Sequence, residues 1–310
     1  MRRDTELTHS TREVFIELQG GLGNQLFQWA YSYLILEEFP SLGRVVIDAR
    51  KYRRPGNRSA HLIDLEPERS YITAPRVVSV LWDMTERTFG KKRTSALAAY
   101  LPVRAPRRGL LESHDAADMI EQIVACRSLW VRSYLQEPTP LLPYRRKLRS
   151  RLVSLIQGSP HFQAGLVDKF SGDDYAAVHV RRGDYLESAR NLERIGACSE
   201  DYYATAISRL SKDKQLVIVS DDPDWCRRHL APRFRGRTHI SAGSHPLTDL
   251  SILMHASELV LSNSTFSWWG AFAGVATKVT APMPWFNELA GGDQLVLEEW
   301  KRVPRDGQFH

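Results

Sequence analysis

The sequence is poor in cysteine. Only three cysteines occur among 310 residues, at Cys126, Cys198 and Cys226, and no two of them form a CxxC pair. Their odd number and wide spacing indicate neither a disulfide framework nor a zinc site. We therefore expect three plain thiols.

The sequence also lacks a long apolar run. Its most apolar stretches, 27–39 and 250–261, are interrupted by polar residues and fall short of the roughly 20 apolar residues that a membrane-spanning helix needs. Residues 1–12 are polar and have no apolar core of the kind found in a signal peptide. A cytoplasmic location is expected.

Acidic residues are outnumbered, since 36 Asp and Glu face 42 Lys and Arg, giving a formal net charge of +6. Basic clusters occur at 53–54, 104–108 and 145–151. The last falls in a stretch with helical periodicity, so its charges are expected on one exposed helix face. We interpret the clusters as solvated surface and expect no nucleic-acid partner. A weak peripheral attraction to anionic lipid at the inner membrane face is compatible with this charge.

The N-terminal half opens with an alternating pattern of elements. A strand is predicted at 14–18, a glycine-rich turn at 20–23, a helix at 24–38 and a second strand at 45–47. Such a βαβ unit implies a parallel sheet. The turn lacks the third glycine of the dinucleotide fingerprint GxGxxG, so it matches that motif weakly.

The C-terminal half alternates more regularly. Strands are predicted at 176–180, 216–219, 238–241, 259–261 and 278–281, and helices at 199–210, from Pro223, and at 246–255 and 264–274. Five short strands alternating with helices predict a doubly wound α/β domain. Between the halves, helical patterns occur near 115–123 and 144–155. Two α/β domains are expected, over 1–165 and 166–310.

The hexapeptide HVRRGD ends the first strand of the C-terminal half. Because side chains alternate along a strand, Val178 and Val180 should enter the core while His179 and Arg181 point the other way. Open α/β sheets bind ligands at this edge, and an arginine fork matches phosphate oxygens. Asp184 is suited to orienting an arginine or accepting a proton. A salt-bridged strand end with a structural histidine is the alternative.

A second polar segment, SNSTFSWWG, separates the strand at 259–261 from the next helix. Helix N-termini attract phosphate, and Ser264 and Thr265 add hydroxyl donors. Together with Arg181 in the same sheet, this segment predicts a diphosphate site. Trp268 and Trp269 are expected to pack between helix and sheet.

A third strand ends in SDDPD. Ser220 and Asp221 are candidates for hydrogen bonds to the base or ribose of a nucleotide. Asp222 and Asp224 formally match the DxD metal motif, but Pro223 favours a helix start with Asp222 as its N-cap. No metal ion is predicted.

Four segments, GGLGNQLFQWAY, HVRRGDY, VIVSDD and SNSTFSWWGAFAG, occur in this order and together resemble the bacterial alpha-1,2-fucosyltransferases of glycosyltransferase family 11. The resemblance extends over about 14–286. It implies a GT-B-like α/β architecture of two Rossmann-like domains with a cleft between them. The N-terminal domain is then the acceptor side and the C-terminal domain binds GDP-fucose. A galactose-containing glycan is the implied acceptor, and neither a metal nor another cofactor is expected.

The resemblance also carries site residues. It implies catalytic roles for Arg181, Asp184 and His179, with Arg181 as the pyrophosphate ligand. The expected donor-binding residues are Arg182, Ser220, Asp221, Asn263, Ser264, Thr265, Ser267, Gly21, Asn24 and Gln25. The middle of the chain matches the family only loosely, at Tyr134-Leu135-Gln136.

The predicted reaction is an inverting transfer of L-fucose to a galactoside hydroxyl in glycan or O-antigen-type polysaccharide synthesis. Arg181 and the helix at Ser264 would stabilise the leaving diphosphate. Asp184 is the candidate general base, with Glu187 and Glu17 as alternatives. Fucosyl transfer with another linkage (alpha-1,6 or protein O-linked), an NAD(P)-dependent oxidoreductase, and a basic nucleic-acid or membrane adaptor remain as other interpretations.

Overall fold

The computed structural model describes residues 13–42, 44–53, 59–69, 71–73, 108–111, 128–171, 174–241, 244–287 and 292–307. Cys126, Arg54, the helical pattern near 115–123 and the basic residues 104–107 lie outside these ranges. The chain divides into two compact units, one built from 1–21 and 27–135 and the other from 22–26 and 136–310.

The first unit contains a five-stranded sheet. Its strands are β1 (Glu13–Glu17), β2 (Arg44–Asp48), β3 (Tyr71–Ile72), β4 (Arg108–Leu111) and β5 (Ser128–Val131). They lie in the order β3-β2-β1-β5-β4, and every pair is parallel. Between β1 and β2 the chain forms α1 (Leu22–Glu38), and η1 (Arg50–Arg53) and α2 (His61–Leu65) follow β2. The predicted βαβ unit and its parallel pairing are confirmed.

The second unit contains a six-stranded sheet. Its strands are β6 (Tyr175–Val180), β7 (Gln215–Ser220), β8 (Thr238–Ser241), β9 (Glu258–Val260), β10 (Lys278–Met283) and β11 (Lys301–Pro304). The order β11-β10-β9-β6-β7-β8 is again parallel throughout. Numbered from β6, this is the 3-2-1-4-5-6 order of a doubly wound nucleotide-binding sheet. The five predicted strands are confirmed, and β11 adds a sixth at the edge.

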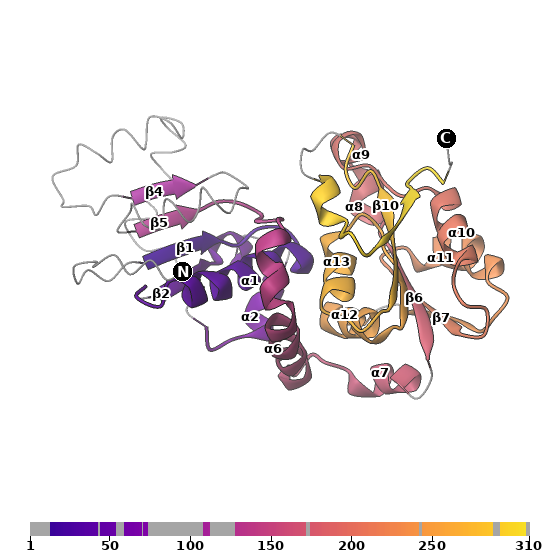
Figure 1. Ribbon diagram of the computed structural model, residues 1–310, viewed down its shortest axis with the longest axis horizontal. Coiled ribbons are helices and arrows are strands. Elements are labelled where there is room, and N and C mark those ends of the chain that lie inside the picture. The colour runs from indigo at the N-terminus through magenta and orange to yellow at the C-terminus, as the bar shows by residue number, and fades with distance from the viewer. Residues whose placement is uncertain are drawn as a thin grey trace. The chain divides into compact units, whose positions relative to one another are not determined.

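Helices cover both faces of this second sheet (Figure 1). The helical elements of the unit are η2 (Thr139–Tyr144), α6 (Arg145–Gly158), α7 (Ala164–Ser171), α8 (Gly183–Glu187), α9 (Ala189–Arg194), α10 (Glu200–Ser208), α11 (Pro223–His229), η3 (Ala231–Arg233), α12 (Pro246–His255), α13 (Thr265–Phe272) and η4 (Gly292–Leu295). Helices α10 and α11 lie on one face, and α12 and α13 on the other (Figure 1). Two Rossmann-like α/β units, the organisation expected of a GT-B-like protein, are thereby confirmed.

Side-chain alternation along β6 separates its two faces as predicted. Val178 and Val180 belong to a buried cluster that includes Tyr202 and Ile207 of α10. His179 faces the opposite side, where its ring lies 5.3 Å from that of Phe266 on α13. The strand is buried along its whole length, so only the residues that follow it can meet a ligand.

The division of the chain differs from the predicted boundary at 165/166, since 136–165 belong to the second unit. The reason is the packing of α6, which buries Leu148, Leu152 and Ile156 and contacts α12. In addition, the Arg145 Nε donates to the Phe272 carbonyl of α13 at 2.6 Å. The exposed basic face of α6 agrees with its predicted amphipathic character.

Two further expectations can be compared with the described residues. Cys198 and Cys226 are buried free thiols, as predicted. Among the helices that the structure describes, none combines the length and the apolar character needed to cross a bilayer.

Candidate functional site

The site lies at the topological switch point of the second sheet. Strands β6 and β9 are hydrogen-bonded neighbours, with Val178 opposite Val260, although the chain visits β7 and β8 between them. Connections leave these two strands toward opposite faces, and open α/β sheets generally bind ligands in a crevice at the carboxyl ends of such a strand pair. The HVRRGD segment follows β6 and the SNST segment follows β9, so the structure places both predicted segments at adjacent strand ends.

His179 connects these two strand ends. Its Nδ1 is hydrogen-bonded to the Ser262 Oγ at 2.7 Å, and the residue is only 5% exposed. Burial, reinforced by the nearby Arg181 charge, lowers the pKa of His179 to about 3. The imidazole is therefore neutral at physiological pH. Its geometry is that of a group that positions the crevice, and it is not poised to carry a proton.

Arg181 lies at the mouth of this edge, held between two carboxylates. Its guanidinium is 2.5 Å from Asp184 Oδ1 and 3.0 Å from Asp221 Oδ2, and it lies 5.8 Å from the Tyr185 ring centre. Burial opposes the charge of Arg181, but Asp221 and Asp184 outweigh it and raise its pKa. About 29% of the side chain remains exposed, so a fixed cation can still meet an anion from solvent.

Arg182, by contrast, is directed toward α11. Its guanidinium stacks 3.9 Å from the Trp225 ring centre, and its Nε is 3.2 Å from Asp222 Oδ2. The other Asp222 oxygen accepts from the Trp225 N–H at 3.1 Å. Asp222 is thus the N-cap of α11 and Pro223 its first residue, as predicted. The neighbouring Asp224 is an acid of the first turn and pairs with Arg227.

Asp221 contacts both Arg181 and Arg182. In addition to its ion pair with Arg181, its Oδ1 accepts from the Arg182 backbone N–H at 2.9 Å. A Cβ at Gly183 would lie 2.9 Å from its Oδ2, so only glycine fits there without a shift. The Ser220 hydroxyl accepts from the Asp222 N–H at 2.9 Å. In the structure Asp221 holds the loop around Arg181, and Ser220 holds the turn that leads into α11. Contact of these two residues with the nucleotide stays a prediction.

Two residues of the SNSTFS segment point into the protein. The Asn263 amide donates to the carbonyls of Ile195 and Gly196 at 3.2 and 3.0 Å, and Asn263 is fully buried. The Ser267 hydroxyl, also fully buried, donates to the carbonyls of Ser262 and Ser264. Both side chains are thus used in hydrogen bonds inside the protein, and their contact with the donor stays a prediction.

Ser264 begins α13. Its side chain accepts from the Phe266 N–H at 3.3 Å, which makes it the N-cap. No acidic residue occupies the first turn of α13, so the positive end of the helix dipole is not neutralised locally. Trp268 and Trp269 are fully buried, as predicted for packing residues.

The first turn of α1 meets the first turn of α13 within the second unit. A Cβ at Gly23 would lie 2.4 Å from the Phe266 backbone nitrogen, so only glycine permits this approach. The Thr265 hydroxyl donates to Asn24 Oδ1 at 2.7 Å. Gly21 is the N-cap of α1 and offers no capping side chain, and the first turn holds no acid. Gln25 is buried behind it.

The three candidate bases differ in their surroundings. Asp184 is paired with Arg181. Glu187 is exposed on α8. Glu17, in the first unit, is buried and lies 2.7 Å from the Arg132 Nε.

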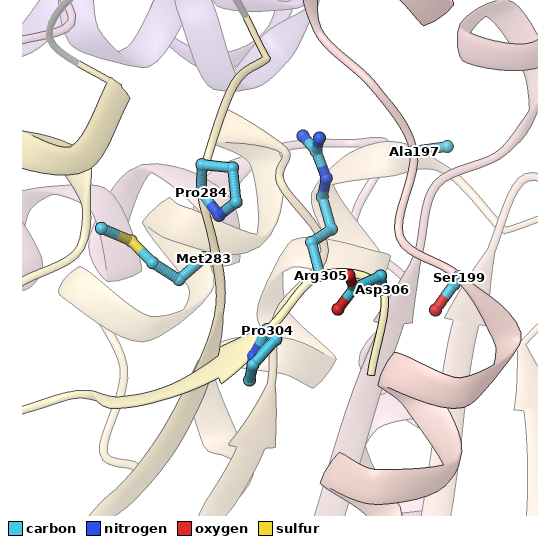
Figure 2. A pocket seen from close by; sticks show the side chains of 7 residues that line it. All are labelled: Ala197, Ser199, Met283, Pro284, Pro304, Arg305 and Asp306. Carbon is cyan, nitrogen blue, oxygen red and sulfur yellow. The ribbon is translucent and has the colours of Figure 1, made fainter. Parts of the chain in front are cut away.

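A separate cavity of about 530 Å³ lies at the same carboxyl edge, next to β10 and β11 (Figure 2). It is lined by Ala197, Ser199, Met283, Pro284, Pro304, Arg305 and Asp306. The Arg305 guanidinium donates to the Ile195 carbonyl at 2.8 Å, the same carbonyl that Asn263 contacts. None of the predicted site residues lines this cavity.

Sequence reasoning missed several residues that contact the predicted site residues. Tyr185 donates through its hydroxyl to the Asn263 carbonyl at 3.2 Å and packs beside Arg181. Trp225 supports Arg182. Gln136 donates to Asn24 Oδ1 at 2.8 Å; the loose family match at 134–136 was the only signal that marked it.

Comparison with known proteins gives a family match. The model of glycosyl transferase family 11 matches residues 125–302. The chain is 25% identical over 305 residues to an alpha-1,2-colitosyltransferase of Escherichia coli, covering 94% of this chain and 99% of that protein. It is 23% identical to an O-antigen biosynthesis glycosyltransferase, WbnK, of the same species, covering 91% and 98%. A galactoside 2-alpha-L-fucosyltransferase of Bos taurus is 30% identical over 136 residues, 41% of this chain and 37% of the relative.

Solved structures show weaker similarity. An Arabidopsis thaliana FUT1 mutant in complex with GDP has a TM-score of 0.49 and 12% identity, covering 89% of this chain and 71% of that one. An Escherichia coli ADP-heptose heptosyltransferase II has a TM-score of 0.47 and 11% identity, covering 94% and 90%. The fold assignment rests on the two sheets themselves.

Proposed function

The chain belongs to glycosyl transferase family 11, and from this premise we propose that it transfers L-fucose from GDP-fucose to the 2-hydroxyl of a galactoside. The observation that carries the proposal is that β6, which Arg181 follows, and β9, which leads to the start of α13, are neighbouring strands with adjacent carboxyl ends. A fixed cation and a helix N-terminus at one crevice suit a diphosphate.

In the proposed reaction the acceptor oxygen bonds to C1 of the donor sugar while the bond from C1 to the diphosphate oxygen breaks. Negative charge then grows on GDP, and the transition state has oxocarbenium character. Arg181 and the amides at the start of α13 would stabilise that charge more strongly than the charge of the bound ground state. Attack from the opposite face inverts the anomeric centre, so a β-linked donor gives an α-linked product.

The acceptor hydroxyl must lose its proton as the bond forms. Asp184 is the proposed recipient because it lies beside Arg181 and about 29% of its side chain is exposed. Arg181 would then hold both the leaving group and the base in a fixed relation. His179 is not proposed for this role because it is buried and already bonded to Ser262.

A metal ion is not part of the proposal. The acids that formally match the DxD motif are engaged elsewhere, because Asp222 caps α11 and pairs with Arg182 while Asp224 pairs with Arg227. The diphosphate charge is proposed to be met by protein donors alone.

GDP-colitose is the second candidate donor. Colitose is the 3-deoxy analogue of L-fucose, so both donors present the same diphosphate to the crevice. The colitosyltransferase of Escherichia coli matches nearly the whole chain, and the relatives named for colitosyl transfer or O-antigen synthesis support a role in O-antigen-type polysaccharide synthesis.

The experiment compares donors directly. The purified chain is incubated with GDP-fucose or GDP-colitose and a panel of β-galactosides, and the linkage of any product is determined by NMR. We expect an α-1,2-linked product with GDP-fucose and a lower kcat/KM with GDP-colitose. A higher kcat/KM with GDP-colitose moves the assignment to the second donor. Failure of GDP to raise the Tm, with stabilisation by NAD instead, contradicts the proposal.

A further inference from the structure

Three side chains from distant parts of the sequence meet at one carboxamide in the second unit. Asn24 lies in the first turn of α1, Gln136 in the connection that follows β5, and Thr265 at the first position of α13. The Gln136 Nε2 donates to Asn24 Oδ1 at 2.8 Å, and the Thr265 hydroxyl donates to the same oxygen at 2.7 Å. These contacts join residues up to 241 positions apart in the sequence.

The two hydrogen bonds fix the orientation of the Asn24 amide. A carboxamide oxygen has two lone pairs and accepts from two donors, and here both positions are filled. The amide nitrogen must therefore point away from Gln136 and Thr265. Among the residues that the structure describes, none accepts a hydrogen bond from the Asn24 Nδ2, and the residue is only half-buried. Two oriented N–H donors are thus left for another molecule.

The backbone around this carboxamide is adapted to hold it. Leu135, directly before Gln136, has φ = 53°, a left-handed conformation that non-glycine residues rarely adopt. Leu135 is also fully buried. On the other side, Gly23 allows α1 to approach the Phe266 nitrogen so closely that a Cβ would collide with it. The left-handed residue thus directly precedes Gln136, and the close approach directly precedes Asn24.

From this geometry we propose that Gln136 is a positioning residue for the transfer reaction. Together with Thr265 it locks the Asn24 carboxamide so that both Nδ2 protons face the diphosphate of the donor. The inference rests on the function proposed above. Gln136 itself touches no substrate, and it acts through Asn24 alone.

The test is a double-mutant cycle. Gln136→Met keeps the length of the side chain but removes the donor, so the Asn24 amide can rotate. Loss of one neutral hydrogen bond corresponds to about a 3- to 10-fold drop in kcat/KM. In an Asn24→Ala background the same substitution should change kcat/KM less than about twofold, since residues that act through one group are not additive. Gln157→Met, at an exposed position of α6, is the matched control and should leave kcat/KM unchanged.

Competitive inhibition by GDP and by GMP gives a readout that a purely structural role does not move. Gln136→Met should weaken inhibition by GDP, because the second phosphate of GDP is proposed to face the carboxamide. Inhibition by GMP should stay as in the wild type. Equal weakening of both nucleotides, or an undiminished loss of kcat/KM in the Asn24→Ala background, overturns the proposal. Wild-type-like kcat/KM for Gln136→Met also overturns it.

If Gln136→Met does not fold, Thr265→Val takes its place in the double-mutant cycle with Asn24→Ala. It removes the second donor to Asn24 Oδ1, and Thr265→Ser, which keeps a hydroxyl, should recover most of the lost kcat/KM. No difference between the two Thr265 variants contradicts the locking of the amide. If the wild-type protein neither binds GDP nor transfers a sugar, it is the proposed function that has failed. If the wild type transfers but the cycle is additive, only the role of Gln136 has failed.

Discussion

Replacing Arg181 by alanine is the perturbation that the site geometry makes most informative. Arg181 is a partly exposed cation fixed between Asp184 at 2.5 Å and Asp221 at 3.0 Å. Removing one preorganised donor to a developing negative charge costs about 2.7–4 kcal/mol, or 10²–10³ in kcat. Here the loss should lie near the upper end, about 4 kcal/mol, because two carboxylates lose their arginine partner beside the proposed diphosphate.

This reasoning predicts a change of sign in a second variant. In the wild type, Asp221→Asn removes the charge of the carboxylate that pairs with Arg181, so Arg181 is held less firmly and kcat/KM should fall. In Arg181→Ala the same substitution removes one of the repelling carboxylates, so it should raise kcat/KM by about 3- to 10-fold, equivalent to about 1 kcal/mol. Asparagine still accepts the hydrogen bond from the Arg182 N–H.

The assay is initial-rate transfer with GDP-fucose at saturating acceptor, accompanied by thermal melts that confirm folding of each variant. Arg181→Lys keeps the charge but loses the two-pronged geometry, so it should fall between the wild type and Arg181→Ala. A folded Arg181→Ala enzyme whose kcat lies within fivefold of the wild type refutes the role of the arginine. A further loss on adding Asp221→Asn to Arg181→Ala refutes the electrostatic explanation.

Three other outcomes are expected. Gly23→Ala should destabilise the fold by about 1–3 kcal/mol because the new Cβ overpacks against the Phe266 nitrogen. The control, Gly165→Ala, lies in α7 with open space around it and should stabilise the fold by roughly 0.5–1 kcal/mol. Equal effects of the two substitutions in urea unfolding contradict the close approach at Gly23. Burial and the nearby Arg181 lower the pKa of His179 to about 3, so below about pH 6.5 the unfolded chain binds a proton that the folded protein does not. The stability that His179 contributes is therefore present above about pH 6.5 and falls by about 1.4 kcal/mol per pH unit below it. A pH series of urea melts should show this slope, and His179→Asn should remove it; an unchanged slope in the variant contradicts a neutral buried imidazole. Transfer activity should persist in excess EDTA, and restoration of lost activity by Mg²⁺ or Mn²⁺ contradicts metal independence.

The strand ends that carry the site could be predicted because periodicity determines them. Alternation along 176–180 places Val178 in the core and His179 on the opposite face, and the structure agrees. The order of strands then places the HVRRGD segment beside the Ser264 helix, since β6 and β9 are neighbours in a doubly wound sheet. Pattern and topology together suffice for this much.

The direction of individual polar side chains could not be predicted in the same way. A motif specifies that Asn263 and Ser267 follow a strand, but a buried polar group must find partners wherever the fold supplies them. The partners of Asn263 lie in the 195–196 loop, 67 and 68 positions away. Asp221 likewise forms an ion pair with Arg181 and accepts a hydrogen bond from the Arg182 backbone N–H, partners that the motif does not specify.

Long-range packing also decides where the units divide and where the sheet ends. The helix α6 has an ordinary amphipathic pattern, and nothing in it indicates that its apolar stripe packs on the second unit. The edge strand β11 is four residues long, begins with two basic residues and ends in proline, features that weaken any strand signal. It becomes a strand because β10 offers it a parallel partner.

The central claim is that one crevice, at the ends of β6 and β9, receives the diphosphate of the donor. A crystal structure of the protein with GDP tests it most directly. We expect a phosphate oxygen within hydrogen-bond distance of the Arg181 guanidinium and another near the first amides of α13. A diphosphate bound elsewhere, with Arg181 still closed between Asp184 and Asp221, contradicts the account.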